Sequence, residues 1–197
     1  MIKILEAAYE AGARGIEAIP IGKILEAAKI MKETHSDYII TGSTYPGRNS
    51  GIEALVNIGA DLIFVHGMIS DNKGTKLFKL LDKIKSYGVI PGIASHDPIS
   101  TITFAIENKL NVKAFLIPFN ANGTFMGNKL ELERLVNNIS EYYFIGMKTL
   151  AAGQLDPELA FEYISKHNIS AVTIGEVDEA EAKISTKIAL NALIKKK

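Results

Sequence analysis

Short apolar runs alternate along this chain with longer segments in which apolar residues recur every three or four positions. The runs have the length of strands and are continuously apolar, which is typical of strands buried on both faces of a parallel sheet. The pattern predicts seven strands, at residues 16–20, 37–42, 61–66, 89–95, 114–118, 142–147 and 171–175.

The segments between these runs have the periodicity of amphipathic helices. They predict eight helices, at residues 2–11, 23–34, 51–59, 74–88, 98–109, 128–140, 157–168 and 178–194. Asp97 and Asp156 each precede a proline, and their carboxylates are expected to cap the helices that follow. Asp178 and Glu181 have the spacing of a capping box at the start of the last helix.

One strand and one helix repeat about every 22 to 29 residues, and this alternation predicts a parallel α/β sheet. The first strand is not followed by the glycine-rich fingerprint of doubly wound dinucleotide folds. We therefore expect residues 1–197 to form one domain, a (β/α)8 TIM barrel. The chain opens inside a helix, so the barrel is expected to lack its first strand through truncation. The alternative is an open seven-stranded sheet with bare edges at 16–20 and 171–175.

Composition narrows the classes of function. Lys and Arg number 22, as do Asp and Glu, so the net charge is zero and nucleic acid is not an expected partner. The absence of cysteine excludes disulfides, iron–sulfur clusters and cysteine-based zinc sites. No apolar run reaches the ~20 residues of a membrane helix. We expect a cytoplasmic protein with a small-molecule substrate, able to form a homo-oligomer, and a solvated tail at residues 195–197.

Active sites of barrels form where the strands end, and polar residues gather at these positions. The candidate substrate-binding and catalytic residues are Tyr45, Arg48, His66, His96 and Lys148. His66 and His96 end successive strands, and a strand can end on histidine because its last residue opens into the pocket. The alternative is a structural histidine. His35 and His167 precede strands and are expected at the surface.

The two strand-end histidines are also weighed as metal ligands, with Asp97 or Glu176 as the carboxylate. No tight spacing such as HxH supports this, so we expect no metal. Lys148 is expected to form a salt bridge with Glu176; alternatively, it forms a Schiff base with a carbonyl substrate. Arg48 lies in a glycine- and serine-bearing loop before a helix, where it is a candidate to bind an anion.

Residues 60–182 resemble the aldo/keto reductase superfamily. The resemblance rests on the order and spacing of four segments: ADLIFVHG, VIPGIASHDP, AFLIPFNANG and IGMKTLAAGQLDPELAFEYISKHNISAVTIGEVDEAEA. It implies a (β/α)8 barrel, NAD(P)H as hydride donor, and a catalytic Asp, Tyr, Lys and His. Of these four, only the histidine matches, as His66. The other three fall at or near Pro20, Leu25 and Gly42, so standard reduction would need another proton donor, for which Tyr45 is the candidate.

The resemblance also implies where the cofactor would bind. In the family, the loop after the last strand and the helix that follows hold the adenosine phosphate. Here that segment is GEVDEAEA, whose carboxylates are Glu176, Asp178, Glu179 and Glu181. They repel a 2′-phosphate, so NADPH is disfavoured more strongly than NADH. The candidate cofactor-binding residues are Ser95, Asn120 and Gly175.

Three functions stay open on the sequence. The first is an aldo/keto reductase-like barrel enzyme acting on a small carbonyl metabolite, an NAD(P)H-dependent oxidoreductase if the cofactor binds. The second is a barrel lyase or isomerase, Schiff-base or metal-dependent, acting on a phosphorylated or carboxylated metabolite. The third is a non-catalytic barrel that binds a ligand. Fold alone does not separate them.

Overall fold

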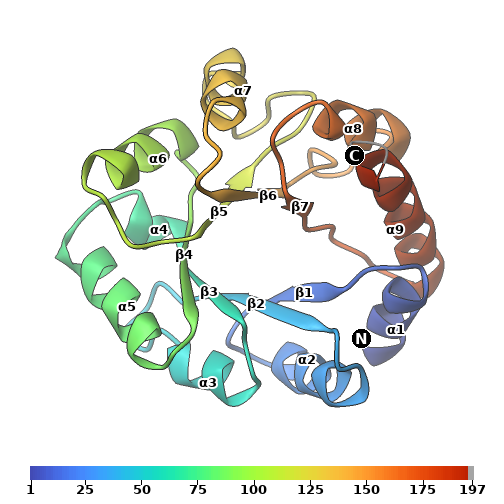
Figure 1. Ribbon diagram of the computed structural model, residues 1–197. Coiled ribbons are helices and arrows are strands. Elements are labelled where there is room, and N and C mark those ends of the chain that lie inside the picture. The colour runs from blue at the N-terminus through green and yellow to red at the C-terminus, as the bar shows by residue number, and fades with distance from the viewer. Residues whose placement is uncertain (195–197) are drawn as a thin grey trace.

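The computed structural model describes residues 1–194 and has the predicted parallel α/β architecture (Figure 1). Its strands are β1 (Gly15–Ala18), β2 (Ile39–Ser43), β3 (Leu62–Val65), β4 (Ile90–Ala94), β5 (Ala114–Pro118), β6 (Tyr143–Met147) and β7 (Ala171–Val172). They form one sheet in the order β1 to β7, and each neighbouring pair is parallel. All seven predicted strands are present, and β7 is much shorter than predicted.

The helices of residues 1–194 lie outside the curled sheet (Figure 1). They are α1 (Ile2–Glu10), α2 (Lys23–Thr34), α3 (Ile52–Asn57), α4 (Gly67–Ser70), α5 (Thr75–Ser86), α6 (Pro98–Glu107), α7 (Lys129–Asn137), α8 (Pro157–Ser165) and α9 (Glu179–Ile194). Eight correspond to the predicted helices. The ninth, α4, was not predicted, because a four-residue helix is too short to show a 3.6-residue period.

The sheet has an outer and an inner apolar layer. The main core packs the outer face of the strands against the helices, through residues such as Ile40, Ile63 and Phe144. The inner face carries a smaller cluster, Phe64, Ala94, Ala114 and Leu116, joined by Leu62, Ile145 and Met147. Gly92 makes room for this cluster, because a Cβ at that position would lie only 2.6 Å from the Phe64 ring.

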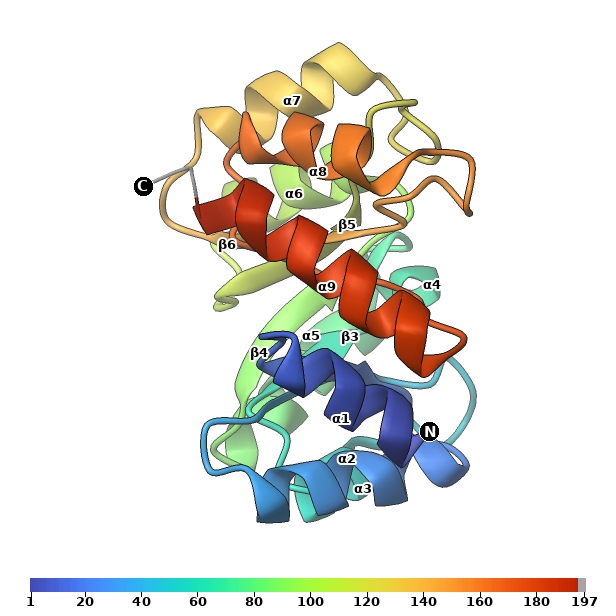
Figure 2. The same cartoon turned by 90° about the vertical axis from the view of Figure 1, so that its right-hand side faces the viewer.

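The curled sheet is not closed within residues 1–194. β1 and β7 each pair with one neighbour only, as expected for a (β/α)8 barrel without its first strand. Across this opening α1 and α9 lie against each other (Figure 2). Lys183 Nζ on α9 is 2.9 Å from Glu10 Oε2 on α1, so the helical layer is continuous where the sheet is interrupted.

The expectation that the strands are buried on both faces is wrong where strands begin, because the first residue of five of the seven strands is exposed. Ile39, Ile90 and Tyr143 are 49%, 44% and 65% exposed. Each is the first residue of its strand. Each lies on the inner face of the sheet, because Ile40, Ile93 and Phe144 of the same strands face the main core on the outer side. The amino-terminal end of the inner face is therefore open to solvent.

Helix capping followed the prediction at two of three helices. Asp156 Oδ1 accepts hydrogen bonds from Glu158 N and Leu159 N. Asp178 Oδ1 accepts from the amides of Ala180 and Glu181. The expectation for Asp97 is wrong: it occupies the N-cap position of α6, but its side chain makes no capping hydrogen bond.

His35 is not the surface residue that was predicted. Its Nε2 lies 2.9 Å from Glu6 Oε2, and its ring stacks on Tyr9 with centroids 3.8 Å apart. His167 packs beside Phe119 and Tyr163. Both histidines therefore join neighbouring elements: His35 contacts α1, and His167 contacts α8 and the residue that follows β5.

None of the helices within residues 1–194 combines the length and the apolar character required to cross a membrane. The predicted solvated tail, residues 195–197, lies outside the described residues.

Candidate functional site

The carboxyl-terminal ends of the parallel strands share one rim of the curled sheet (Figure 1), and the predicted site residues lie at or just beyond it. His66 follows β3, and His96 lies two residues after β4. Their ring centroids are 5.7 Å apart, edge to face. The structure thus brings the two strand-end histidines together, as neighbouring parallel strands require.

His66 is fixed in one orientation by α4. Its Nδ1 accepts a hydrogen bond from Met68 N at 3.1 Å, which makes it the N-cap of this short helix. Burial lowers the pKa of His66 below its ordinary value, His96 lowers it further, and Asp71 partly opposes both. The ring is therefore neutral at neutral pH, and its proton is on Nε2, since Nδ1 is the acceptor. It can donate a hydrogen bond to a carbonyl oxygen at the rim.

Asp71, which the sequence did not single out, organises this part of the rim. Its Oδ1 accepts hydrogen bonds from Ser95 Oγ at 2.6 Å and Thr101 Oγ1 at 2.8 Å. Its Oδ2 accepts from His96 N at 2.9 Å. One carboxylate beyond β3 therefore holds both the end of β4 and the start of α6. No sequence signal identified it, because its role depends on the unpredicted helix α4.

Close backbone approach also positions His96. A Cβ on Gly67 would lie 2.5 Å from His96 Nδ1, so the imidazole packs directly against this glycine. His96 Nδ1 is 3.9 Å from Asp71 Oδ2, too far for a hydrogen bond. The ring is held by packing and by its backbone amide.

Lys148 lies on the opposite side of the rim, directly after β6. Its Nζ is 3.7 Å from the centroid of the Phe125 ring, which comes from the loop after β5. The predicted salt bridge with Glu176 is wrong: within residues 1–194 the lysine forms no ion pair with this carboxylate. The ammonium contacts an aromatic face instead, a cation–π geometry.

The backbone around Lys148 has an unusual conformation. Lys148, Ala151 and Ala152 have φ angles of 54°, 48° and 59°, in the left-handed region that non-glycine residues seldom adopt. Phe125 has a φ of 63°. Such conformations cost about 1–3 kcal/mol each and cluster at functional sites. Both partners of the cation–π contact are therefore held in place by strained loops.

Glu176 follows β7 on the strand next to Lys148. Both of its carboxylate oxygens are buried and accept no hydrogen bond from residues 1–194. Burial raises the pKa of Glu176 to about 7, and the neighbouring Glu181 and Asp178 carboxylates contribute to this rise. It is thus a carboxyl group that exchanges its proton near neutral pH.

Glu17 is a second carboxylate that the sequence did not single out. It lies on β1 between Ile16 and Ala18, which pack in the outer core, so it faces the inner side. Burial raises its pKa, and hydrogen bonding to Ser43 partly offsets the rise. Its Oε1 has no partner within residues 1–194.

The predicted cofactor-binding residues are largely occupied by local structure. Ser95 Oγ donates to Asp71 and accepts from Asp97 N at 3.0 Å. Asn120 is buried; its Nδ2 donates to Thr124 O and Lys148 O. Gly175 is exposed, with open space around the position of a Cβ.

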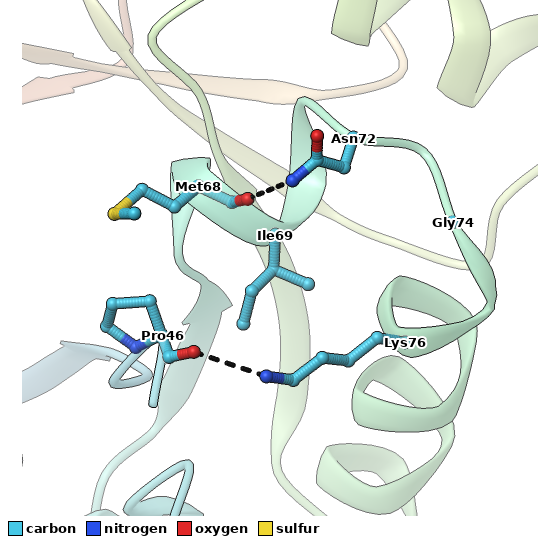
Figure 3. Close-up of a pocket in the computed structure, with 6 residues that line it drawn as sticks. All are labelled: Pro46, Met68, Ile69, Asn72, Gly74 and Lys76. Atoms are coloured by element: carbon cyan, nitrogen blue, oxygen red, sulfur yellow. Dashed lines mark hydrogen bonds between the residues drawn. The ribbon is translucent and has the colours of Figure 1, made fainter. Parts of the chain in front are cut away.

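The loop after β2 carries Tyr45 and Arg48, both exposed. Lys76 Nζ donates to the carbonyls of Pro46 and Gly47 at 3.2 Å each, which ties this loop to α5. Beside it lies a cavity of about 230 Å³, lined by Pro46, Met68, Ile69, Asn72, Gly74 and Lys76 (Figure 3). Arg48 forms no ion pair within residues 1–194, and anion binding by this loop stays a prediction.

Among residues 1–194, no group of three or more His, Asp or Glu side chains is arranged to hold a metal ion. His66 and His96 adjoin Asp71, but its carboxylate is engaged by two hydroxyls and an amide.

The amino-terminal end of α9 is capped by the chain's own carboxylates. Asp178 accepts hydrogen bonds from two of its amides, and Glu181 Oε2 accepts from Val177 N at 3.1 Å. Phosphates bind helix ends through free backbone amides. Here those amides already donate to the chain's own carboxylates. Glu176 adds a further negative group when ionised.

No protein-family model and no curated protein matches this sequence. Solved structures resemble it in fold. A protein from Pseudomonas aeruginosa assigned to the aldo-keto reductases has a TM-score of 0.75 at 15% identity, covering 98% of this chain and 82% of that one. The holo form of an aldo-keto reductase from Bacillus halodurans has a TM-score of 0.71 at 13% identity, covering 95% and 80%.

Other barrels resemble it as well. The KDPG aldolase of Legionella pneumophila, with pyruvate captured as a covalent carbinolamine intermediate, has a TM-score of 0.56 at 16% identity. It covers 98% of this chain and 86% of its own. The chain is thus an α/β protein of the TIM-barrel class, with a seven-stranded, open form of the fold seen in aldo-keto reductases. At these identities the similarity concerns fold alone.

Proposed function

We infer that this chain is an enzyme of aldo-keto reductase-like fold that acts on a small carbonyl compound, and that Lys148 forms a Schiff base with it. The observation that carries this proposal is the placement of Lys148 Nζ over the Phe125 ring, without a carboxylate partner in residues 1–194. No carboxylate holds the ammonium in its charged form, so the lysine can lose a proton and become the amine nucleophile that a Schiff base requires.

The surroundings of Lys148 suit this reaction. The face of an aromatic ring stabilises a cation, and the iminium ion of a Schiff base is a cation at the same nitrogen. The strained backbone at Lys148 fixes the side chain at the end of β6. His66 supplies a neutral Nε2–H donor elsewhere on the same rim. The carbinolamine captured in the Legionella aldolase supports the view that barrels of this shape accommodate such adducts.

Reductive trapping tests this proposal. The protein is incubated with pyruvate, glycolaldehyde or dihydroxyacetone phosphate in the presence of sodium cyanoborohydride, and modified lysines are located by peptide mass spectrometry. Lys148 is expected to be modified much faster than Lys79, an exposed lysine of α5. Lys148→Met is expected to remove the fast modification. Equal modification of both lysines with all three probes would overturn the proposal.

The second candidate is carbonyl reduction with a nicotinamide cofactor, which the similarity to aldo-keto reductases favours, one of them in its holo form. The acidic end of α9 opposes it and disfavours NADPH more than NADH. Quenching of intrinsic tyrosine fluorescence on titration with each cofactor tests it. Saturable binding of NADH supports this candidate, and no quenching with either cofactor excludes it.

A further inference from the structure

The carboxylate of Glu176 is buried without a hydrogen-bond partner, and the Lys148 chemistry proposed above leaves it unused. Both Oε1 and Oε2 lack partners among residues 1–194. Burying a carboxylate in this way is costly, and a buried unsatisfied group in a native fold calls for an explanation. A gain in stability does not explain this buried carboxylate, because no hydrogen bond offsets the cost of burying it.

The other carboxylates of the same segment do have structural roles. Asp178 accepts two amide hydrogen bonds at the start of α9, and Glu181 accepts one from Val177. Glu176 is also a carboxyl residue of this segment, but neither of its oxygens accepts a hydrogen bond within residues 1–194. Helix capping therefore does not account for its position.

β6 and β7 pair in parallel, so Lys148 and Glu176 follow the carboxyl-terminal ends of neighbouring strands. The pairing of the two segments continues beyond β7, where Thr173 N donates a hydrogen bond to Gly146 O at 2.8 Å. Thr149 Oγ1 then lies 3.4 Å from Thr173 O. The two segments thus leave the sheet side by side, one with the lysine and the other with the glutamate.

We propose that Glu176 is the proton-transfer group of the Lys148 site, an inference that rests on the proposed function. The Lys148 ammonium first releases a proton to water; its neutral Nζ then bonds to the carbonyl carbon while one amine proton passes to the carbonyl oxygen, which gives a carbinolamine. The nitrogen lone pair then forms the C=N bond as the C–O bond breaks. The protonated Glu176 carboxyl gives its proton to the departing hydroxyl, which leaves as water.

This step leaves an iminium ion with one hydrogen on nitrogen and Glu176 as a carboxylate. Hydrolysis reverses it, with the carboxylate accepting a proton from the attacking water. Burial, together with the negative charges of Glu181 and Asp178, gives Glu176 a pKa of about 7. A carboxyl group with this pKa can both give and accept a proton at neutral pH.

The rate at which pyruvate is trapped on Lys148 by cyanoborohydride, measured from pH 5 to pH 9, tests the proposal. Glu176→Gln is expected to slow trapping by about 100-fold, the lower end of general acid–base contributions. The matched control is Glu179→Gln, which removes an exposed carboxylate from the same helix start and is expected to leave the rate unchanged.

The pH profile separates a proton-transfer role from a structural one. For the wild type, log rate against pH is expected to bend near pH 7, and this bend is expected to disappear in Glu176→Gln. Glu181→Gln removes one of the charges that raise the pKa of Glu176, so it is expected to move the bend to lower pH. Glu176→Asp, which keeps a carboxyl group, is expected to recover part of the rate and the bend.

The outcomes distinguish the two proposals. If the wild type is not trapped at Lys148, the proposed function fails. If Lys148 is trapped at the wild-type rate in Glu176→Gln with the bend retained, the proton-transfer role alone fails. Should Glu176→Gln not fold, Glu176→Asp decides: a pH bend supports the role of Glu176, and its loss overturns it.

Discussion

The two sides of the rim use polar side chains in opposite ways. After β3 and β4, Asp71 accepts three hydrogen bonds, which hold Ser95, His96 and Thr101 in a single network. After β6 and β7, Lys148 contacts an aromatic ring and the Glu176 oxygens contact no donor within residues 1–194. The Asp71 carboxylate thus has hydrogen-bond donors for both of its oxygens, whereas the Glu176 carboxylate has none among residues 1–194.

The difference suggests separate roles for the two sides: one orients a substrate and the other carries the reactive groups. A satisfied, partly buried hydrogen-bond network rigidifies the structure around it, so the β3–β4 side is suited to holding a substrate in one orientation. An unsatisfied carboxylate and an amine without an ion-pair partner retain their capacity to react. The comparison therefore predicts that mutations on the two sides affect stability in opposite directions.

The largest effect is expected from removing Asp71. Asp71→Ala leaves two hydroxyls and the His96 amide without their acceptor, so the free energy of unfolding should fall by about 2–4 kcal/mol. Urea denaturation measures this change. Asp82→Ala, which removes an exposed carboxylate from α5, is the control and should stay within about 0.5 kcal/mol of the wild type. Equal effects for both variants would contradict the role of the network.

Glu176→Gln should change stability in the other direction, and only at higher pH. The carboxyl has a pKa of about 7 in the folded protein, above its ordinary value of 4.5. Folding therefore takes up a proton between these values, and the stability contributed by this group is lost as pH rises through 7.

At pH 8.5, Glu176→Gln should thus be more stable than the wild type by on the order of 1 kcal/mol, allowing for solvent screening. At pH 4.5 the two proteins should be alike. Urea denaturation at the two pH values measures the difference. A gain of the same size at both would mean that the charge of Glu176 is not its cause.

The smallest effects are expected from the two N-cap aspartates. Asp156→Ala removes an acceptor for two amides of α8 and should cost about 1 kcal/mol. Asp97→Ala, at the same position of α6, should cost much less because its side chain makes no capping bond. Thermal unfolding of the two variants checks this order. A larger loss for Asp97→Ala would show that Asp97, rather than Asp71, holds the start of α6.

The sequence was most informative where a pattern repeats. Continuous apolar runs located all seven strands, and helical periodicity located eight of the nine helices described in residues 1–194. The strand ends correctly indicated that His66 and His96 lie together. The sequence failed where a structure is too short to have a period: α4 was missed, and Asp71 with it.

It also failed where two partners compete for one side chain. A lysine and a glutamate on neighbouring strand ends favour an ion pair on charge alone, yet Lys148 lies over Phe125. That contact depends on left-handed backbone at both residues. Local sequence does not determine such conformations, because non-glycine residues adopt them only when the surrounding fold compensates for the strain.

The order of strands and helices, and with it the parallel sheet, follows from local sequence, because hydrophobic periodicity acts within short segments. Which polar groups at the rim find partners depends on how distant segments pack together. Satisfaction of a buried carboxylate depends on donors from distant segments, as with Asp71, Ser95 and Thr101. Glu176 has no such donor within residues 1–194, and that absence is a property of the packed fold rather than of the residues around it in sequence.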